Sequence, residues 1–211
     1  MTKLRVINFA VSLDGYGAGV DQTLDDPLGT DGERLHEWAV QTKWFGGPGS
    51  PDGIDDRFID AGFENIGATI MGRNMYGPVR GEWGEDMWTG WWGSNPPYHH
   101  PTFVLTHHAH DPIEMEGGTT FHFVTDGIES AFEQATAAAA GQDIRLGGGV
   151  STIQQYLDVG LVDDMHLAVV PILLGAGERL LDRTDRLDGF GPPEIVASTT
   201  VTHLTWRRQR R

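Results

Sequence analysis

The chain has 211 residues, of which 39% are hydrophobic, and a formal charge of −15, which argues against nucleic acid as a partner because phosphate-backbone binding needs a basic face. It contains no cysteine, which excludes disulfides and thiolate metal sites and fits a cytoplasmic protein. It has no signal-peptide pattern and no run of about 18 apolar residues, so we expect one largish domain without a membrane segment.

The first third of the chain predicts two strands joined by loops and helices. Leu4 to Ser12 is an apolar run typical of a strand, and a Leu-Asp-Gly-Tyr turn follows it. Helices are expected at 33–42 and 55–65. Between them, residues 45–53 must form a loop, because two prolines and four glycines break any regular element. A short buried strand is expected at 68–71.

Residues 82–100 carry four of the seven tryptophans but show neither a helical nor a strand period. Aromatic side chains in such a segment either line a pocket or pack against the core. We expect the packing role, because large aromatic side chains bury well in most settings.

The rest of the chain alternates strands and helices, with strands expected at 102–106, 119–124 and 165–174. Asp126 and Glu129 have capping-box spacing at the start of a helix. The buried face of that helix would hold Ile128, Ala131, Phe132 and Ala135. Two alternating segments, 194–200 and 201–207, end the chain as a joined pair of strands. This order indicates an α/β protein whose sheet is mostly parallel, with antiparallel strands at its C-terminal edge.

The most informative motif is the strand at 144–146, which runs into three glycines and then into a helix start. Ser151 and Gln154 have capping-box spacing, and Val150, Ile153 and Leu157 fall on one helical face. Consecutive glycines leave no Cβ to block a ligand, and the N-terminus of a helix favours a phosphate. The motif fits either a phosphate site or a tight connection without a ligand.

Two other strand ends carry candidate ligand-binding side chains. Arg73 follows the strand at 68–71 and either clamps a phosphate or pairs with one of the many carboxylates. Thr106, His107 and His108 end the strand at 102–106, where a parallel sheet presents its ligand-binding loops. The three strand ends together suit a nucleotide. No His-Glu-x-x-His spacing occurs, so no metal site is expected, and the Rossmann and P-loop fingerprints are absent.

These motifs resemble those of the dihydrofolate reductase-like superfamily, in the branch of the reductase domain of the riboflavin-biosynthesis deaminase/reductase. The resemblance rests on residues 12–16 (Ser-Leu-Asp-Gly-Tyr), 71–74 (Met-Gly-Arg-Asn), 146–149 (Leu-Gly-Gly-Gly) and 169–175 (Val-Val-Pro-Ile-Leu-Leu-Gly). It implies a dihydrofolate reductase-like fold, with a mostly parallel central sheet, helices on both faces and a C-terminal antiparallel β-hairpin. That fold would form a single domain over 1–211, with long insertions at about 17–66 and 80–100.

The resemblance also implies an activity: an NADPH-dependent reductase of the pyrimidine reductase kind. Such an enzyme transfers a hydride to a C=N or C=O bond of a small pterin- or pyrimidine-like substrate. The implied cofactor residues are Ala10, Val11 and Ser12 along the nicotinamide, Gly72, Arg73, Asn74, Thr106, His107 and His108 at the adenosine phosphate end, and Leu146, Gly147, Gly148, Gly149, Val150, Ser151 and Thr152 around the pyrophosphate. Asp14 and Glu178 are the catalytic candidates, although Asp14 can equally brace its own turn.

The resemblance leaves other points open. Similar proteins commonly form homodimers, and one face of the alternating segment 194–207 is apolar and needs burial, so we expect a homodimer.

The chain has neither the length nor the cysteines of a zinc deaminase domain. His107 and His108 stand where the family more often has serine, lysine or arginine, which leaves the choice between NADPH and NADH open. Two other functions fit: a nucleotide-binding or sensor protein without turnover, and a flavin- or deazaflavin-dependent reductase.

Overall fold

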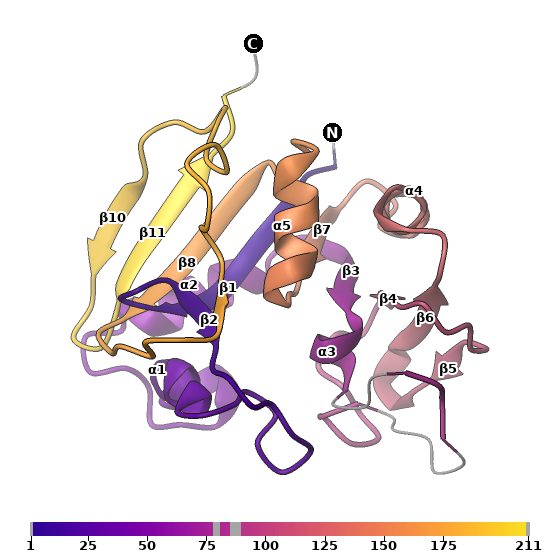
Figure 1. Cartoon of the computed structure of the whole chain (residues 1–211), viewed down its shortest axis with the longest axis horizontal. Coiled ribbons are helices and arrows are strands. Elements are labelled where there is room, and N and C mark those ends of the chain that lie inside the picture. Colours follow the sequence, from indigo (N-terminus) through magenta and orange to yellow (C-terminus); the bar gives the residue numbers. More distant parts are fainter. Residues whose placement is uncertain (1, 78–80, 85–89, 210–211) are drawn as a thin grey trace.

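The computed structural model describes residues 2–77, 81–84 and 90–209. Within these ranges, nine strands form one sheet in the order β10-β11-β8-β1-β7-β3-β4-β6-β5 (Figure 1). The parallel strands are β1 (Leu4–Ser12), β3 (Ile66–Gly72), β4 (Pro101–Leu105), β6 (Thr120–Val124), β7 (Asp143–Leu146) and β8 (Asp164–Val170). Antiparallel strands lie at the edges: β5 (Ile113–Glu114), β10 (Glu194–Ala197) and β11 (Thr202–Arg207). The predicted mostly parallel sheet with a C-terminal antiparallel hairpin is confirmed.

Helices cover both faces of this sheet, as predicted. The α-helices are α1 (Glu37–Val40), α2 (Ile54–Phe63), α3 (Arg73–Tyr76), α4 (Ile128–Ala138) and α5 (Val150–Asp158), and the short 3₁₀ helices are η1 (Gly32–His36), η2 (Lys43–Phe45) and η3 (Glu116–Gly118). Figure 1 shows α5 in front of the sheet and α2 behind it. Apolar residues of α4 and α5 pack with β1, β3 and β7 in one core cluster. Residues of η1, α1 and α2 pack with β1 and β8 in another.

The strand boundaries follow the sequence pattern closely, with one clear exception. β1 begins and ends at the predicted residues, and β3, β4 and β6 lie within two residues of theirs. The apolar run predicted at 165–174 is only partly a strand, because β8 ends at Val170. Pro171 has no N–H to continue the ladder, and Ile172 N turns back to donate to Val170 O (2.8 Å).

Both capping-box predictions are wrong. The residue at the N-cap of α4 is Gly127, and that of α5 is Gly149, and neither helix has a side-chain cap hydrogen bond. The buried faces were predicted correctly: Ala131 and Ala135 of α4 are fully buried, as is Ile153 of α5. The sequence pattern therefore located the helices but not the way they begin.

The segment between the first two long strands contains a short strand, β2 (Tyr16–Ala18), which pairs with β9 (Glu178–Arg179) in a separate two-stranded sheet. The helix predicted at 33–42 is split between η1 and α1. The loop predicted at 45–53 precedes α2, and its first residue belongs to η2.

A buried polar chain fixes α2 to the sheet. Asn8 N donates to His166 Nδ1 (3.2 Å), and His166 Nε2 lies 3.0 Å from His203 Nδ1. His203 Nε2 in turn lies 2.9 Å from Asp55 Oδ1 on α2. Since His166 Nδ1 accepts a hydrogen bond, the proton of neutral His166 is on Nε2, and both histidines donate toward Asp55. The Phe58 ring stacks on both imidazoles.

The tryptophan-bearing segment is only partly described, because Trp88 lies outside the described residues. Trp83 packs against a third core cluster, with its ring 4.9 Å from that of Phe123, whereas Trp92 is 41% exposed.

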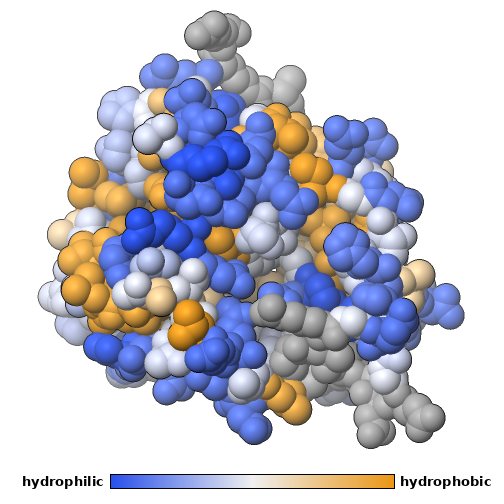
Figure 2. All heavy atoms as spheres, viewed as in Figure 1, coloured by the Kyte–Doolittle hydropathy of each residue, from blue (hydrophilic) through white to orange (hydrophobic). Residues whose placement is uncertain are grey.

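Figure 2 shows that hydrophilic side chains cover most of the viewed face and that hydrophobic ones gather on its left, beside the lower ends of β10 and β11. No helix among the described residues combines the length and apolar character needed to cross a bilayer.

Candidate functional site

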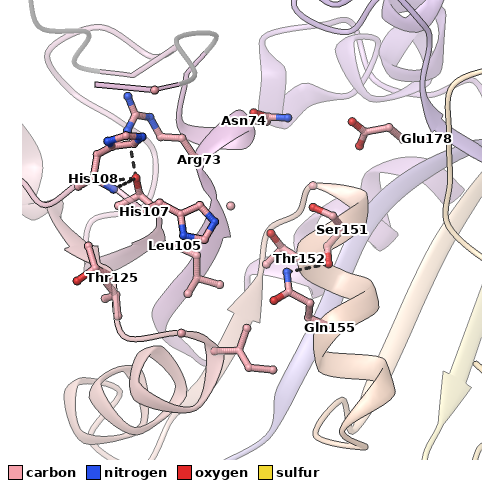
Figure 3. Close-up of a pocket in the computed structure, with 17 residues that line it drawn as sticks. Arg73, Asn74, Leu105, His107, His108, Thr125, Ser151, Thr152, Gln155 and Glu178 are labelled. Atoms are coloured by element: carbon pink, nitrogen blue, oxygen red, sulfur yellow. Dashed lines mark hydrogen bonds between the residues drawn. The ribbon is translucent and has the colours of Figure 1, made fainter. Parts of the chain in front are cut away.

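A cleft of about 340 Å³ lies at the carboxyl ends of β3, β4 and β6, beside the start of α5. Figure 3 shows two facing walls. The first wall carries Arg73, His107, His108 and Thr125, and the second carries Ser151, Thr152 and Gln155 of α5 together with Glu178. The cleft is in the size range of small-molecule and cofactor sites, and ligands of open α/β sheets bind at this edge.

Arg73 is held firmly on the first wall. Its Nη1 donates to Thr106 Oγ1 (3.1 Å), and its guanidinium carbon lies 3.2 Å from the centroid of the Trp83 ring. Burial lowers the pKa of Arg73, and its Nη2 is buried without a hydrogen-bond partner. Within the described ranges no carboxylate forms an ion pair with it. An oriented cation with an unused donor therefore borders the cleft.

His108 completes the basic side of the cleft. Its backbone N donates to Thr106 Oγ1 (3.2 Å), and its backbone O accepts from Trp83 Nε1 (3.0 Å). Its Nδ1 lies 3.1 Å from Oε1 of the exposed Glu82. His107 is exposed beside it. Thr106 thus orders both the arginine and the loop that presents the histidines.

On the second wall, the glycine turn brings β7, β3 and α5 close together. Gly147 N donates to Ile70 O (2.8 Å), and Gly72 N donates to Gly148 O (2.7 Å). A Cβ added at Gly72 would lie only 2.3 Å from Thr152 Oγ1, so no larger residue fits there without movement. Gly148 has a φ of 115°, which favours glycine. Gly149, Ser151 and Thr152 line the cleft, so the uncapped N-terminus of α5 opens onto it.

The structure gathers many of the predicted cofactor residues on the cleft wall. These are Gly72, Arg73, Asn74, Thr106, His107, His108, Gly149, Ser151 and Thr152. The others do not line it: Leu146 and Val150 are core residues, and Gly147 and Gly148 contribute the backbone contacts to β3. Ala10, Val11 and Ser12 are buried at the end of β1 and also lie off the cleft wall.

Several wall residues were missed by the sequence analysis. They are Gly81, Leu105, Val124, Thr125, Gly127, Ile128 and Gln155. Thr125 and Gly127 follow β6, the parallel neighbour of β4, so the strand-end argument used for Thr106 would have found them. Gln155 lies one helical turn beyond Ser151 and donates from Nε2 to Ser151 O (3.2 Å).

The two catalytic candidates lie in different settings. Asp14 accepts from Ser12 Oγ (2.6 Å) and from the backbone N of Leu174 (3.2 Å) and Gly175 (2.8 Å). The Ser12 hydrogen bond and these backbone donors lower the pKa of Asp14 to about 2. This geometry matches the bracing role, because both carboxylate oxygens accept hydrogen bonds from the protein's own groups. Glu178, in contrast, lines the cleft.

The described residues contain no group of three or more His, Asp or Glu side chains placed to hold a metal ion. The site therefore consists of a basic wall, a helix N-terminus and a single carboxylate, Glu178, among the residues that line the cleft.

A comparison with known protein families identifies the family of this chain. The family model of the RibD C-terminal domain matches residues 5–204. The chain belongs to the RibD C-terminal domain family. It is thus a reductase-type member of the dihydrofolate reductase-like superfamily, as the motifs predicted. No curated protein gives a significant sequence match.

Two solved structures support the fold. A protein from Shewanella sp. PV-4, described as a riboflavin biosynthesis protein, is 24% identical with a TM-score of 0.60, and the match covers 100% of both chains. Dihydrofolate reductase from Enterococcus faecalis, in complex with NADP(H) and RAB-propyl, is 15% identical with a TM-score of 0.52, and the match covers 99% of this chain and 97% of that one. The predicted dihydrofolate reductase-like fold is confirmed.

Proposed function

We propose that the protein is an NADPH-dependent reductase that acts on a C=N or C=O bond of a small pterin- or pyrimidine-like substrate. The observation that carries the proposal is that Arg73 and the uncapped N-terminus of α5 border the same cleft from opposite walls. Phosphates bind both kinds of group, through charge-assisted hydrogen bonds to guanidinium and through backbone N–H groups at a helix start. The family and the NADP(H) complex of the dihydrofolate reductase support the choice of cofactor.

The residues present fit such a cofactor. The buried Nη2 of Arg73 lacks a partner, which an adenosine phosphate oxygen would provide. A Cβ built on Gly149 would meet nothing within 4 Å, so a pyrophosphate can approach the backbone at the start of α5 near Ser151 and Thr152. Bound NADPH would supply the hydride, and the protein would supply binding and orientation.

Glu178 is our candidate for positioning or protonating the substrate, because it is the predicted catalytic carboxylate that lines the cleft. With candidate pterin and pyrimidine substrates, Glu178→Gln should lower turnover by about 10²–10⁴, the usual share of general acid–base catalysis. NADPH binding should not weaken in this variant, because a carboxylate offers the cofactor phosphates no attraction. Normal turnover would assign the proton to water.

Calorimetric titration with NADPH, NADH and FMN tests the cofactor. Arg73→Glu should weaken NADPH binding by about 1.5–3 kcal/mol, which is roughly a 10- to 150-fold rise in Kd. The matched control is Arg57→Glu, which makes the same charge change at an exposed position on α2. Equal NADPH affinity in wild type and Arg73→Glu would refute the site. FMN binding in place of NADPH would favour a flavin enzyme, and NADPH binding without turnover would favour a sensor.

A further inference from the structure

The two faces of β7 carry different kinds of residue. Ile144 and Leu146 point into the core beneath α5, so the alternating residues Arg145 and Gly147 point to the opposite face. A Cβ built on Gly147 would lie 3.6 Å from Thr69 Cγ2 and 3.9 Å from Met71 Cβ, which places β3 side chains on this same face. The face therefore continues from Arg145 toward the carboxyl end of β7.

Arg145 is surrounded by aromatic and neutral polar side chains, which we call the Arg145 cluster: Phe63, Thr69, Tyr98 and His100 around Arg145 itself. The guanidinium carbon lies 4.8 Å from the Phe63 ring centroid. Thr69 Oγ1 lies 2.8 Å from His100 Nε2. Thr69 is also the register partner of Arg145 on β3. These residues come from α2, β3, β7 and the segment that precedes β4.

No negative charge balances Arg145 within the described part of the chain. The neighbouring residue on β1 is another arginine, Arg5, whose own charge is met by Asp143 (3.4 Å). Burial lowers the pKa of Arg145, and the nearby Tyr98 only partly opposes that effect. Burial, Arg145 and His99 lower the pKa of His100 to about 4, so its imidazole is neutral at pH 7.

The hydrogen-bonding capacity of Arg145 is also unused. Its Nε is buried without a partner, and the described residues provide no hydrogen bond to the rest of the guanidinium. The residue as a whole is half-buried. The chain has 30 acidic residues, yet none of those described pairs with this cation. Buried charges in proteins are normally paired, and an unpaired one is costly to keep.

We propose that Arg145 binds an oxyanion group of the substrate, a carboxylate or a phosphate, on the face of the sheet opposite α5. The planar guanidinium matches both groups, because each presents two oxygens to its parallel N–H donors. The inference rests on the proposed function, since the substrate would extend from the carboxyl end of β7 along this face to Arg145. Arg145 would then select anionic substrates over neutral ones.

Titration calorimetry with inorganic phosphate and with acetate tests this site. The parent protein is Arg73→Glu, which removes the other phosphate-binding arginine. We expect saturable binding of at least one of the two anions to this parent, and at least 10-fold weaker binding after Arg145→Met. Arg145→Lys keeps the positive charge but lacks the parallel N–H donors of a guanidinium, so its anion affinity should lie between those of the parent and Arg145→Met. Arg5→Met, which removes the neighbouring paired arginine, should bind like the parent.

The outcomes separate this site from the cofactor site. If neither anion binds the parent, or if Arg145→Met or Arg145→Lys binds as tightly as the parent, the inference is overturned. Should Arg145→Met fail to fold, Arg145→Lys alone decides. Each single Arg145 variant should retain wild-type NADPH affinity. If the wild type does not bind NADPH but Arg145→Met still weakens anion binding to the parent, the proposed function is refuted and the anion site is retained.

Measurements of thermal unfolding distinguish anion binding by Arg145 from a purely structural role of this residue. If Arg145 only supported Phe63, Arg145→Met would lower the midpoint of thermal unfolding, and phosphate would not change that midpoint in the parent. We expect instead that phosphate or acetate raises the midpoint of the parent and leaves that of the Arg145→Met variant unchanged.

Discussion

Gly72 lies so close to α5 that even a methyl group at this position should be costly. A Cβ there would lie 2.3 Å from Thr152 Oγ1 and 3.5 Å from Thr152 Cβ. The backbone of Gly72, with φ −80° and ψ 162°, suits any residue, so Gly72→Ala adds a steric clash without backbone strain. Thr152 is 4% exposed and lies in the first turn of α5, so the clash must move either its side chain or the helix.

We expect Gly72→Ala to lower the free energy of unfolding by about 1–3 kcal/mol, the usual cost of overpacking. Each kcal/mol corresponds to a fall in Tm of about 2–4 °C for a protein of this size. NADPH affinity should fall as well, because Gly72 and Thr152 both line the cleft. Thr152→Ala removes the clashing oxygen, so the double variant should be within about 1 kcal/mol of Thr152→Ala alone.

Urea unfolding, followed by tryptophan fluorescence, measures all three variants in one double-mutant cycle. Gly84→Ala is the control, because a Cβ at Gly84 would meet nothing within 4 Å. The reasoning is refuted if Gly72→Ala is as stable as the wild type, or if its cost is the same with threonine and with alanine at position 152.

Three further predictions concern pH, the Asp14 turn and assembly. Burial and the neighbouring His203 lower the pKa of His166 from 6.5 to about 3, so below pH 6.5 the unfolded state takes up a proton that the folded state does not. The free energy of unfolding should therefore be about 2 kcal/mol lower at pH 5 than at pH 8, and a flat profile in urea titrations would contradict this. Asp14→Asn should lower Tm, because the Gly175 amide loses a charged acceptor, but it should leave the Kd for NADPH unchanged; an unaltered Tm would rule out the bracing role. We also expect a homodimer, because β10 is an edge strand whose Ile195 is 63% exposed, and light scattering at micromolar concentration should give about twice the 23.1 kDa of one chain rather than that mass itself.

The strands and helices were predictable wherever a local pattern is sufficient. The boundaries of β1 follow from its apolar run, and the buried face of α5 follows from the spacing of Val150, Ile153 and Leu157. The capping predictions at Asp126 and Ser151 failed because a glycine directly precedes each helix and takes the N-cap position. A capping-box pattern considers only the spacing of the polar residues and takes no account of the glycine that the chain needs in the turn before each helix.

The cleft was predictable as far as it is built from strand ends. Arg73, Thr106 and Ser151 belong to different strand-to-helix or strand-to-loop connections, and the rule for parallel sheets brings them to one edge. The contact between Arg73 and Trp83 and the Arg145 cluster were not predictable, because their members meet only through the tertiary fold. The low pKa of Asp14 has its largest cause in the nearby Ser12 hydroxyl, and only the added backbone amides of Leu174 and Gly175 come from far along the chain.

The pairing of β1 has a consequence for how the protein is made. Both neighbours of β1 in the sheet, β7 and β8, come from the last third of the chain. Since β1 leaves the ribosome before either of these strands, it has no partner until residues 143–146 have been synthesised, and its backbone stays unpaired until then. Nascent chains stalled before residue 143 should accordingly depend on chaperones and aggregate when released, since β1, an interior strand of the sheet, then lacks both of its partners.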